Sequence, residues 1–170
     1  MTKPPSPLEG SAAERIAALT SDNPYRSSGR KPRLLIVGAG MMGREHLRVS
    51  QLLGWADVQG IVDPDGGSLE WACSDWRLLT NAPLTIYRDL NEACLDEAVD
   101  AIVIATPNHT HRDVLHAVAP SHKPVLLEKP MATTLADAMD IVNLARAHPA
   151  VIQLGMQYRF KAQYVEALQA

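Results

Sequence analysis

Hydrophobic and polar positions alternate in a regular way from residue 33 onward, where short apolar runs are separated by longer stretches with helical spacing. The apolar runs lie at residues 34–37, 58–62, 84–87, 101–105, 125–127 and 151–154. The stretches with helical spacing lie at residues 41–54, 67–79, 89–97, 109–119 and 133–147. Strands that alternate with helices at this spacing predict βαβ units and a parallel sheet.

Two of the apolar runs of four or more residues contain no polar position. Leu-Leu-Ile-Val at 34–37 and Ala-Ile-Val-Ile-Ala at 101–105 are apolar throughout, which is typical of strands covered by helices on both faces. The sequence therefore predicts the α/β class, with a doubly wound parallel sheet as the middle of three αβα layers. Right-handed crossovers place the carboxyl ends of all the strands on one edge, where ligands bind in such folds.

The first 31 residues differ from the rest, because they are rich in proline, serine and alanine. We expect residues 1–31 to form a flexible extension, in which the capping-box spacing of Ser11 and Glu14 is compatible with one short helix. No apolar segment typical of a signal peptide follows the first residue. We expect the main domain to span residues 32–158, and residues 159–170 to begin a linking helix.

Composition excludes several classes of protein. The chain has 170 residues and a net charge of −3, which argues against a nucleic-acid binder with a broad basic face. No run approaches the roughly 18 to 20 apolar residues of a membrane helix. Cys73 and Cys94 belong to no metal-binding motif, so no metal site is predicted. We expect two buried thiols and a cytoplasmic location rather than a disulfide.

The strongest motif is the glycine loop Gly38-Ala39-Gly40-Met41-Met42-Gly43, which follows the first predicted strand and opens a helix. In a dinucleotide-binding fold Gly38 permits the tight turn, Gly40 lets a pyrophosphate approach the backbone, and Gly43 lets the helix pack on the strand. The alternative is a plain strand-to-helix turn. Along the helix we expect a core-facing stripe of Met42, His46, Val49 and Leu53, with His46 as a packing residue.

Asp63 ends the second predicted strand, 20 residues beyond Gly43. At that spacing a carboxylate accepts hydrogen bonds from the adenosine ribose, and it repels a 2′-phosphate. The sequence therefore favours NAD, while NADP stays possible, with Arg44 and Arg77 as the nearest cations. The alternative for Asp63 is a helix N-cap or turn residue.

Two further strand ends reach the same edge, namely Ala105-Thr106-Pro107-Asn108-His109-Thr110-His111 and Leu127-Glu128-Lys129-Pro130. With these motifs the chain resembles the Gfo/Idh/MocA family of nicotinamide-dependent oxidoreductases, typified by glucose-fructose oxidoreductase and inositol dehydrogenase. The resemblance covers roughly residues 33 to 170 and includes Gly155-Met156-Gln157-Tyr158-Arg159-Phe160. Its specific part is the combination of the Thr-Pro-Asn and Glu-Lys-Pro turns.

The resemblance implies roles for particular residues. The cofactor-binding residues that it implies are Gly38, Gly40, Met41, Met42, Gly43, Asp63, Thr106, Pro107, Asn108, Glu128 and Lys129. Lys129 is also the catalytic candidate, because a lysine beside the reacting carbon can donate a hydrogen bond to the substrate oxygen and stabilise an alkoxide. The alternative for Lys129 is a surface lysine paired with Glu128 or Asp113. His111 is expected to order the turn at Thr106, without a catalytic role.

The resemblance also implies what this chain lacks. Family members carry a second, mostly antiparallel β-sheet domain that supplies a catalytic Asp and His, and we expect that domain to be missing beyond Ala170. The chain is then the NAD(H)-favouring half of an oxidoreductase that transfers hydride between the cofactor and a sugar or polyol carbon. The alternative is a non-catalytic dinucleotide-binding module or truncated remnant, so enzyme activity is left open. Self-association through an exposed apolar patch near the last strand is expected, and the role of Arg159 stays open.

Overall fold

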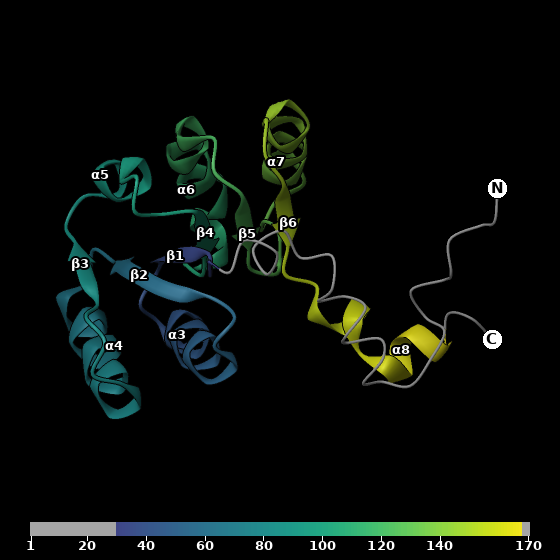
Figure 1. The fold of residues 1–170 in the computed structure, drawn as a ribbon. Helices are drawn as coiled ribbons and strands as arrows, with labels where there is room; N and C mark the ends of the chain where they lie inside the picture. The colour runs from purple at the N-terminus through teal and green to yellow at the C-terminus, as the bar shows by residue number, and fades with distance from the viewer. Residues whose placement is uncertain (1–29, 168–170) are drawn as a thin grey trace. The chain divides into compact units, whose positions relative to one another are not determined.

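The computed structural model describes residues 30–167, and residues 32–156 form one compact unit within it (Figure 1). The strands of this unit are β1 (Arg33–Val37), β2 (Asp57–Val62), β3 (Thr85–Tyr87), β4 (Ala101–Ile104), β5 (Val125–Leu127) and β6 (Ile152–Leu154). They form one parallel sheet in the order β3-β2-β1-β4-β5-β6. The order reverses beside β1, so the crevice between the carboxyl ends of β1 and β4 is the expected place for a ligand.

Helices cover both faces of the sheet. They are α3 (Met41–Leu53), α4 (Gly66–Leu79), α5 (Leu90–Leu95), α6 (His111–Val118) and α7 (Leu135–Ala147). The short 3-10 helices η1 (Asn108–Thr110) and η2 (Ala119–Ser121) flank α6. Helices α3 and α4 lie on one face, and α5, α6 and α7 lie on the other (Figure 1). The predicted three-layer doubly wound fold is confirmed.

The core consists of two clusters, one on each side of the sheet. Leu35 and Ile104 pack with the side chains of α5, α6 and α7, whereas Ile36 and Val103 pack with those of α3 and α4. Successive residues of a strand therefore enter opposite clusters, as the period of two requires. Both faces of the sheet are covered along β1 and β4, which explains why residues 34–37 and 101–104 contain no polar position.

Side chains cap the starts of α4, α5 and α7, whereas α3 and α6 have no side-chain cap. The carboxylates of Asp65 and Asp89 accept backbone N–H bonds at the starts of α4 and α5, and the Thr134 hydroxyl does so at the start of α7. Helix α3 begins at Gly40, where no side chain accepts a hydrogen bond. Its first N–H groups are therefore left for water or a ligand.

The buried face of α3 differs from the predicted stripe. Gly43 and Leu47 are the buried residues of this helix, while His46 and Val49 are half-buried and Leu53 is exposed. The predicted partial burial of His46 is thus confirmed, and Met42 and Val49 are half-buried too, whereas the prediction is wrong for Leu53, which lies at the last position of the helix. Both cysteines are free thiols as predicted, but the prediction that both are buried is wrong for Cys73, which is partly exposed, while Cys94 is buried.

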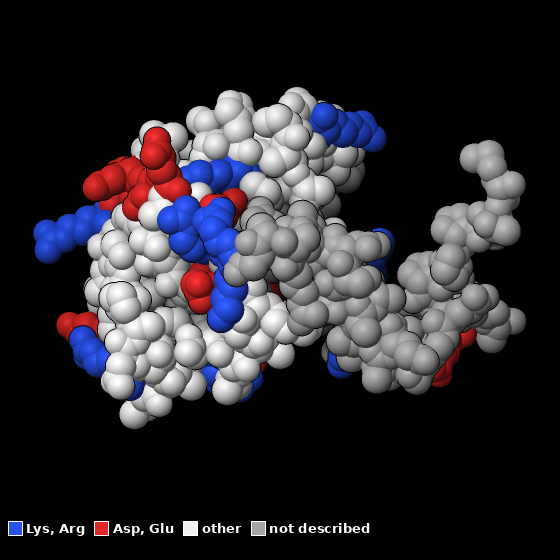
Figure 2. Space-filling model, viewed as in Figure 1, with Lys and Arg blue, Asp and Glu red and all other residues white. Residues whose placement is uncertain are grey.

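Charged side chains gather at the amino edge of the sheet, opposite to the strand ends that carry the motifs. Figure 2 shows acidic side chains over α5 with basic ones beside them. Arg33, at the start of β1, donates to Asp100 across 3.1 Å, and Lys123 donates to the Asp96 carbonyl across 2.6 Å. Each of these hydrogen bonds joins the beginning of one strand, or the residues just before it, to the loop that precedes a neighbouring strand.

The remaining described residues belong to a second unit. They form the 3-10 helix η3 (Gln157–Phe160) and the helix α8 (Ala162–Ala167), which keep the side chains of Tyr158 and Tyr164 stacked with ring centroids 5.1 Å apart. Arg159 is exposed on η3. Of the expected extension at residues 1–31, residues 1–29, with the short helix after Ser11, lie outside the described residues. Among residues 30–167 no helix is long and apolar enough to cross a membrane.

Candidate cofactor-binding site

The three glycines of the loop have three different surroundings. Gly38 has a φ of +101°, which side chains rarely adopt, and a Cβ on it would lie 2.8 Å from the Ala105 carbonyl group. A Cβ on Gly43 would collide with the Gly38 carbonyl oxygen. A Cβ on Gly40 would meet nothing within 4 Å. The backbone conformation and packing at positions 38 and 43 therefore require glycine, whereas the space above Gly40 is open for a ligand.

A cavity of about 710 Å³ opens beside the loop, along the carboxyl edge of the sheet. Its walls come from the ends of β1, β2 and β4 and from the first turns of α3, α4, α5 and α6. The lining residues are Val37, Gly38, Gly40, Met41, Met42, Val62, Asp63, Pro64, Asp65, Ser68, Leu90, Ala105, Thr106, Pro107, Thr110 and Val114. The cavity thus combines an uncapped helix start, carboxylates at the end of β2 and an apolar wall.

Asp63 stands in this cavity and also holds the glycine loop. Its Oδ2 accepts the Ala39 N–H across 2.7 Å, and its Oδ1 accepts the Asp65 N–H across 2.8 Å. The N-cap of α4 is Asp65 rather than Asp63, so that alternative is wrong, while the role in the turn is confirmed. Each carboxylate oxygen has a further lone pair, which leaves capacity for ribose hydroxyls.

Asp65 adds a second acidic group at the same strand end. Hydrogen bonds from the Ser68 side chain and backbone hold the pKa of the Asp65 carboxyl below its ordinary value. Its negative charge at neutral pH disfavours a second phosphate close to the end of β2. This supports the preference for NAD that the sequence predicts from Asp63.

The turn after β4 is fixed by hydrogen bonds to side chains. The Thr110 hydroxyl lies 2.9 Å from the Thr106 hydroxyl and 2.8 Å from the Pro107 carbonyl oxygen. His111 is 1% exposed, and its Nε2 lies 3.0 Å from the Thr106 carbonyl oxygen. Its Nδ1 lies 3.0 Å from the Pro130 carbonyl oxygen. His111 orders the turn as predicted, and it also joins that turn to the one after β5.

At the end of β5, Glu128 is buried and Lys129 is exposed. The Glu128 Oε1 lies 2.9 Å from the His46 Nε2, and its Oε2 accepts the Lys129 backbone N–H across 3.1 Å. Within the described part of the chain, the Lys129 amino group forms no ion pair with Glu128 or Asp113. Asp113 pairs instead with Arg112. The surface exposure that the alternative expects is therefore observed, whereas the expected ion pair is absent among the described residues.

The predicted site residues do not all line one cavity. The predicted residues that line it together are Gly38, Gly40, Met41, Met42, Asp63, Thr106 and Pro107. Gly43 does not line the cavity, but it packs closely against the Gly38 carbonyl group of the loop. Asn108, Glu128 and Lys129 are not among the lining residues. Sequence reasoning missed the lining residues Leu90, Thr110 and Val114, which contribute from the starts of helices after β3 and β4. Only their position could have predicted them, because the helices that follow β3 and β4 start at the same edge of the sheet as the strand ends.

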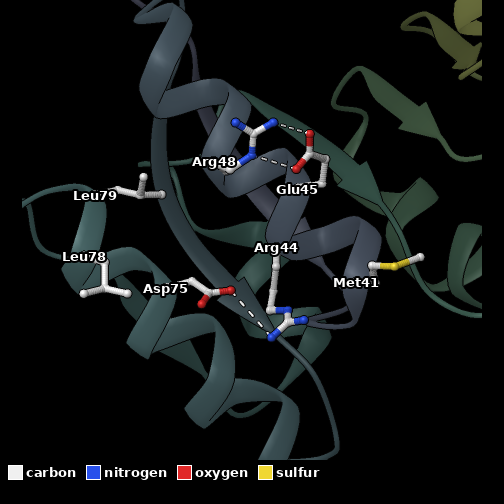
Figure 3. Close-up of a pocket in the computed structure, with 7 residues that line it drawn as sticks. All are labelled: Met41, Arg44, Glu45, Arg48, Asp75, Leu78 and Leu79. Carbon is white, nitrogen blue, oxygen red and sulfur yellow. Dashed lines mark hydrogen bonds and ion pairs between the residues drawn. The ribbon is translucent and has the colours of Figure 1, made fainter.

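A smaller cavity of about 350 Å³ lies between α3 and α4, and charged side chains paired with one another line it (Figure 3). Arg44 reaches Asp75 across 3.6 Å, and Arg48 binds Glu45 across 2.6 Å. The bond from Arg48 lowers the pKa of the Glu45 carboxyl. Arg44 also lies over the Trp71 ring, 5.7 Å from its centroid. Arg44, one of the nearest cations for a 2′-phosphate, is thus already engaged.

No group of acidic, histidine or cysteine side chains within residues 30–167 is suited to hold a metal ion. The open space above Gly40, the uncapped start of α3 and the carboxylate at the end of β2 fit a dinucleotide instead. Backbone N–H groups at a helix start bind phosphate, and the adjoining cavity accommodates an adenosine.

Comparison with known proteins agrees with this geometry. Residues 32–156 match the family model of Gfo/Idh/MocA oxidoreductases, described as an oxidoreductase family with an NAD-binding Rossmann fold. Inositol 2-dehydrogenase 1 of Saccharopolyspora erythraea is 33% identical over 141 residues, covering 81% of this chain and 40% of the relative. Inositol 2-dehydrogenase of Leifsonia xyli is 35% identical over 138 residues, covering 78% of this chain and 38% of the relative.

Solved structures show the same similarity. A myo-inositol dehydrogenase from Lactobacillus casei, in complex with NAD(H) and myo-inositol, matches with a TM-score of 0.69 and 28% identity over 82% of this chain and 40% of its own. An NAD-binding protein from Listeria innocua matches with a TM-score of 0.63 and 30% identity over 74% of this chain and 34% of its own.

The chain thus spans about 40% of the length of the curated relatives that it matches. The predicted resemblance is confirmed, and so is NAD as the cofactor of this fold. The chain belongs to the Gfo/Idh/MocA family of oxidoreductases, and residues 32–156 are its NAD-binding Rossmann domain.

Proposed function

We propose that NAD(H) binds along the carboxyl edge of the sheet, with its pyrophosphate at the start of α3 and its adenosine ribose at Asp63. The observation that carries the proposal is the open space above Gly40, where an uncapped helix start adjoins a cavity lined by Asp63. The nicotinamide half then extends toward the ends of β4 and β5, because these strands lie on the other side of β1 from β2.

The proposed activity is that of an oxidoreductase acting on a hydroxyl-bearing carbon. When bound, NAD supplies the hydride acceptor of this chemistry. Lys129 is the group that we propose to donate a hydrogen bond to the substrate oxygen and to take part in proton transfer. Its exposed amino group and the buried carboxylate of Glu128, which fixes its peptide, support this role. Asn108 follows the turn that carries Thr106 and Pro107, beside the same strand ends.

A polyol or sugar is the substrate class that we propose. The curated relatives include inositol dehydrogenases, and one solved relative holds myo-inositol together with NAD(H). Since the chain spans about 40% of these relatives, catalysis by the whole protein is a proposal. The same coverage favours one second candidate, in which this chain alone binds the dinucleotide without catalysing a reaction.

A calorimetric titration of the 170-residue chain with NADH and then NADPH tests the proposed cofactor site. We expect the binding of both nucleotides to be measurable, and NADH to bind more tightly than NADPH. The control is Arg48→Gln, which removes a cation from α3 outside the cavity and should leave both affinities unchanged. A folded chain that binds neither nucleotide, or one that prefers NADPH, would contradict the proposal.

We infer a cytoplasmic location from the two unpaired thiols, because free cysteines are typical of reducing compartments. The direct test is to measure the oxidation state of the two cysteines in cell extracts. A disulfide-linked or oxidised population of Cys73 and Cys94 in freshly quenched cells would argue against it.

A further inference from the structure

His46 and Glu128 form a pair that joins two parts of the proposed site. His46 lies on α3, one turn after Gly43, and Glu128 follows β5. Their side chains are 22% and 11% exposed, and 2.9 Å separates the Nε2 from the Oε1. The other oxygen of Glu128 accepts the backbone N–H of Lys129. One carboxylate thus connects the helix of the glycine loop to the peptide that carries Lys129.

The position of the Glu128 carboxylate depends on this pair, because the carboxylate is largely buried. A largely buried carboxylate requires hydrogen-bond donors, and removing one leaves a costly unsatisfied group. Gly155 lies close to the same carboxylate, since an added Cβ on it would lie 3.5 Å from the Glu128 Oε1. The His46 ring is the side-chain partner that the structure gives to this carboxylate. Without the ring, the carboxylate must turn toward water at the carboxyl edge.

The pair lies in one half of the site. Asp63 marks the adenosine half at β2, whereas Glu128 follows β5, beyond β4 in the strand order. A dinucleotide that crosses the edge at the glycine loop has its nicotinamide half on the side of β4 and β5. A change at His46 should therefore act on the nicotinamide half and leave the adenosine half as it is.

We propose that His46 is a positioning residue for the nicotinamide half of the site, acting through Glu128 on the peptide and side chain of Lys129. This inference rests on the proposed function, since it takes the placement of the nicotinamide half from there. His46 itself is not a lining residue of the large cavity, so a contact with the adenosine half does not account for the expected effect.

The test compares NADH with ADP, which has the adenosine and pyrophosphate but lacks the nicotinamide nucleoside. Calorimetry uses the 170-residue chain and its variants His46→Leu, His46→Gln and His116→Gln. His116 is the matched control, because it pairs with Asp140 on the surface, away from the cavity. The wild-type chain should bind NADH more tightly than ADP.

We expect His46→Leu to weaken NADH binding about tenfold and ADP binding by less than about twofold. His46→Gln keeps an N–H donor and should restore NADH affinity to within about threefold of the wild type. His116→Gln should change neither affinity. A role limited to packing of α3 would instead weaken both ligands together, since the glycine loop serves both.

Equal losses for NADH and ADP, or no loss for either, would overturn the positioning role. A wild-type chain that binds NADH no more tightly than ADP would overturn the proposed placement of the nicotinamide half, and the inference with it. Should His46→Leu fail to fold, Glu128→Met breaks the same pair, because its side chain has a similar length and no oxygen acceptor. A loss confined to NADH would then support the inference, and equal affinities for wild type and variant would contradict it.

Discussion

The Asp63 carboxylate has two roles, because it accepts hydrogen bonds from the Ala39 amide of the glycine loop and the Asp65 amide, and it also lines the cavity. Asp63→Asn keeps one oxygen acceptor while removing the charge. We expect NADH affinity to fall about tenfold, since charge-assisted bonds to ribose hydroxyls are lost. NADPH affinity should fall less, because repulsion of the 2′-phosphate is also removed. Titrations with both nucleotides measure the difference, and equal losses would show that Asp63 serves only the turn.

Tyr87 and Asp96 form a second residue pair with a measurable consequence. The Tyr87 hydroxyl donates to Asp96 across 2.6 Å, and burial together with this bond raises the pKa of Tyr87 to about 12. The same hydrogen bond, with the Ala98 amide, lowers the pKa of Asp96. Tyr87→Phe should therefore reduce the free energy of unfolding by about 1 kcal/mol at neutral pH.

The pH dependence of this loss follows from the direction of the shift in Asp96. A carboxyl whose pKa is lowered by folding stabilises the fold above its unfolded pKa of about 4, and this contribution is lost as the pH falls through the folded pKa. The difference between wild type and Tyr87→Phe should therefore narrow under acid conditions. Urea unfolding at neutral and acid pH measures it. A difference that stays constant or widens in acid would contradict the assignment.

At the scale of elements, the proposed cofactor site lies at the junction of β1 with α3. Substitutions at two glycines of this junction distinguish a loss of cofactor affinity from a loss of stability. A Cβ at position 43 would collide with the Gly38 carbonyl oxygen, whereas a Cβ at position 40 meets open space. Gly43→Ala should lower the free energy of unfolding by about 2 to 3 kcal/mol, because the helix must move away from the strand.

Gly40→Ala is the matched change. It should cost less than about 1 kcal/mol of stability, because Gly40 has a φ of −67° that alanine adopts and only the N-cap preference is lost. NADH affinity should nevertheless fall, since the methyl group occupies the space proposed for the pyrophosphate. Thermal unfolding and NADH titration of both variants measure these effects. A Gly40→Ala variant that binds NADH as the wild type does would contradict the proposed position of the pyrophosphate.

Much of the arrangement of elements was predictable from the sequence, because buried strands and amphipathic helices have distinct periods. Each predicted strand from 34–37 to 151–154 corresponds to an observed strand with small differences at its ends. The exposure of Leu53 was not predictable from the apolar spacing of α3. Leu53 is the last residue of the helix and is 52% exposed, which depends on where the helix ends against the sheet.

The site was predictable only in part, for a similar reason. Asp63 and the glycine loop form a local motif, and they line one cavity as expected. His46 was interpreted as a packing residue because its partner Glu128 is 82 residues away in the sequence. Leu90 and Val114 have no motif of their own, and they line the cavity because α5 and α6 start at the same edge. Long-range partners of this kind require the tertiary structure.

At the scale of the whole molecule, apolar side chains remain exposed around the outer edge of the sheet. Leu135 and Met139 on α7 are 80% and 52% exposed, and Val151 before β6 is 69% exposed. Such surfaces favour association. We expect the chain to self-associate in sedimentation experiments, and the double variant Leu135→Glu, Met139→Glu to shift it toward the monomer. A wild-type chain that stays monomeric at high concentration would contradict this expectation.

The central claim is that NAD(H) lies across the carboxyl edge of the sheet, from the end of β2 to the end of β5. Mapping of backbone amide NMR shifts on addition of NADH tests it most directly. We predict shifts at residues 38–43, 63–65, 106–108 and 128–129, with ADP reproducing those at 38–43 and 63–65 but not those at 128–129. Shifts confined to the smaller cavity between α3 and α4, or to the amino edge around Arg33 and Asp100, would contradict the claim.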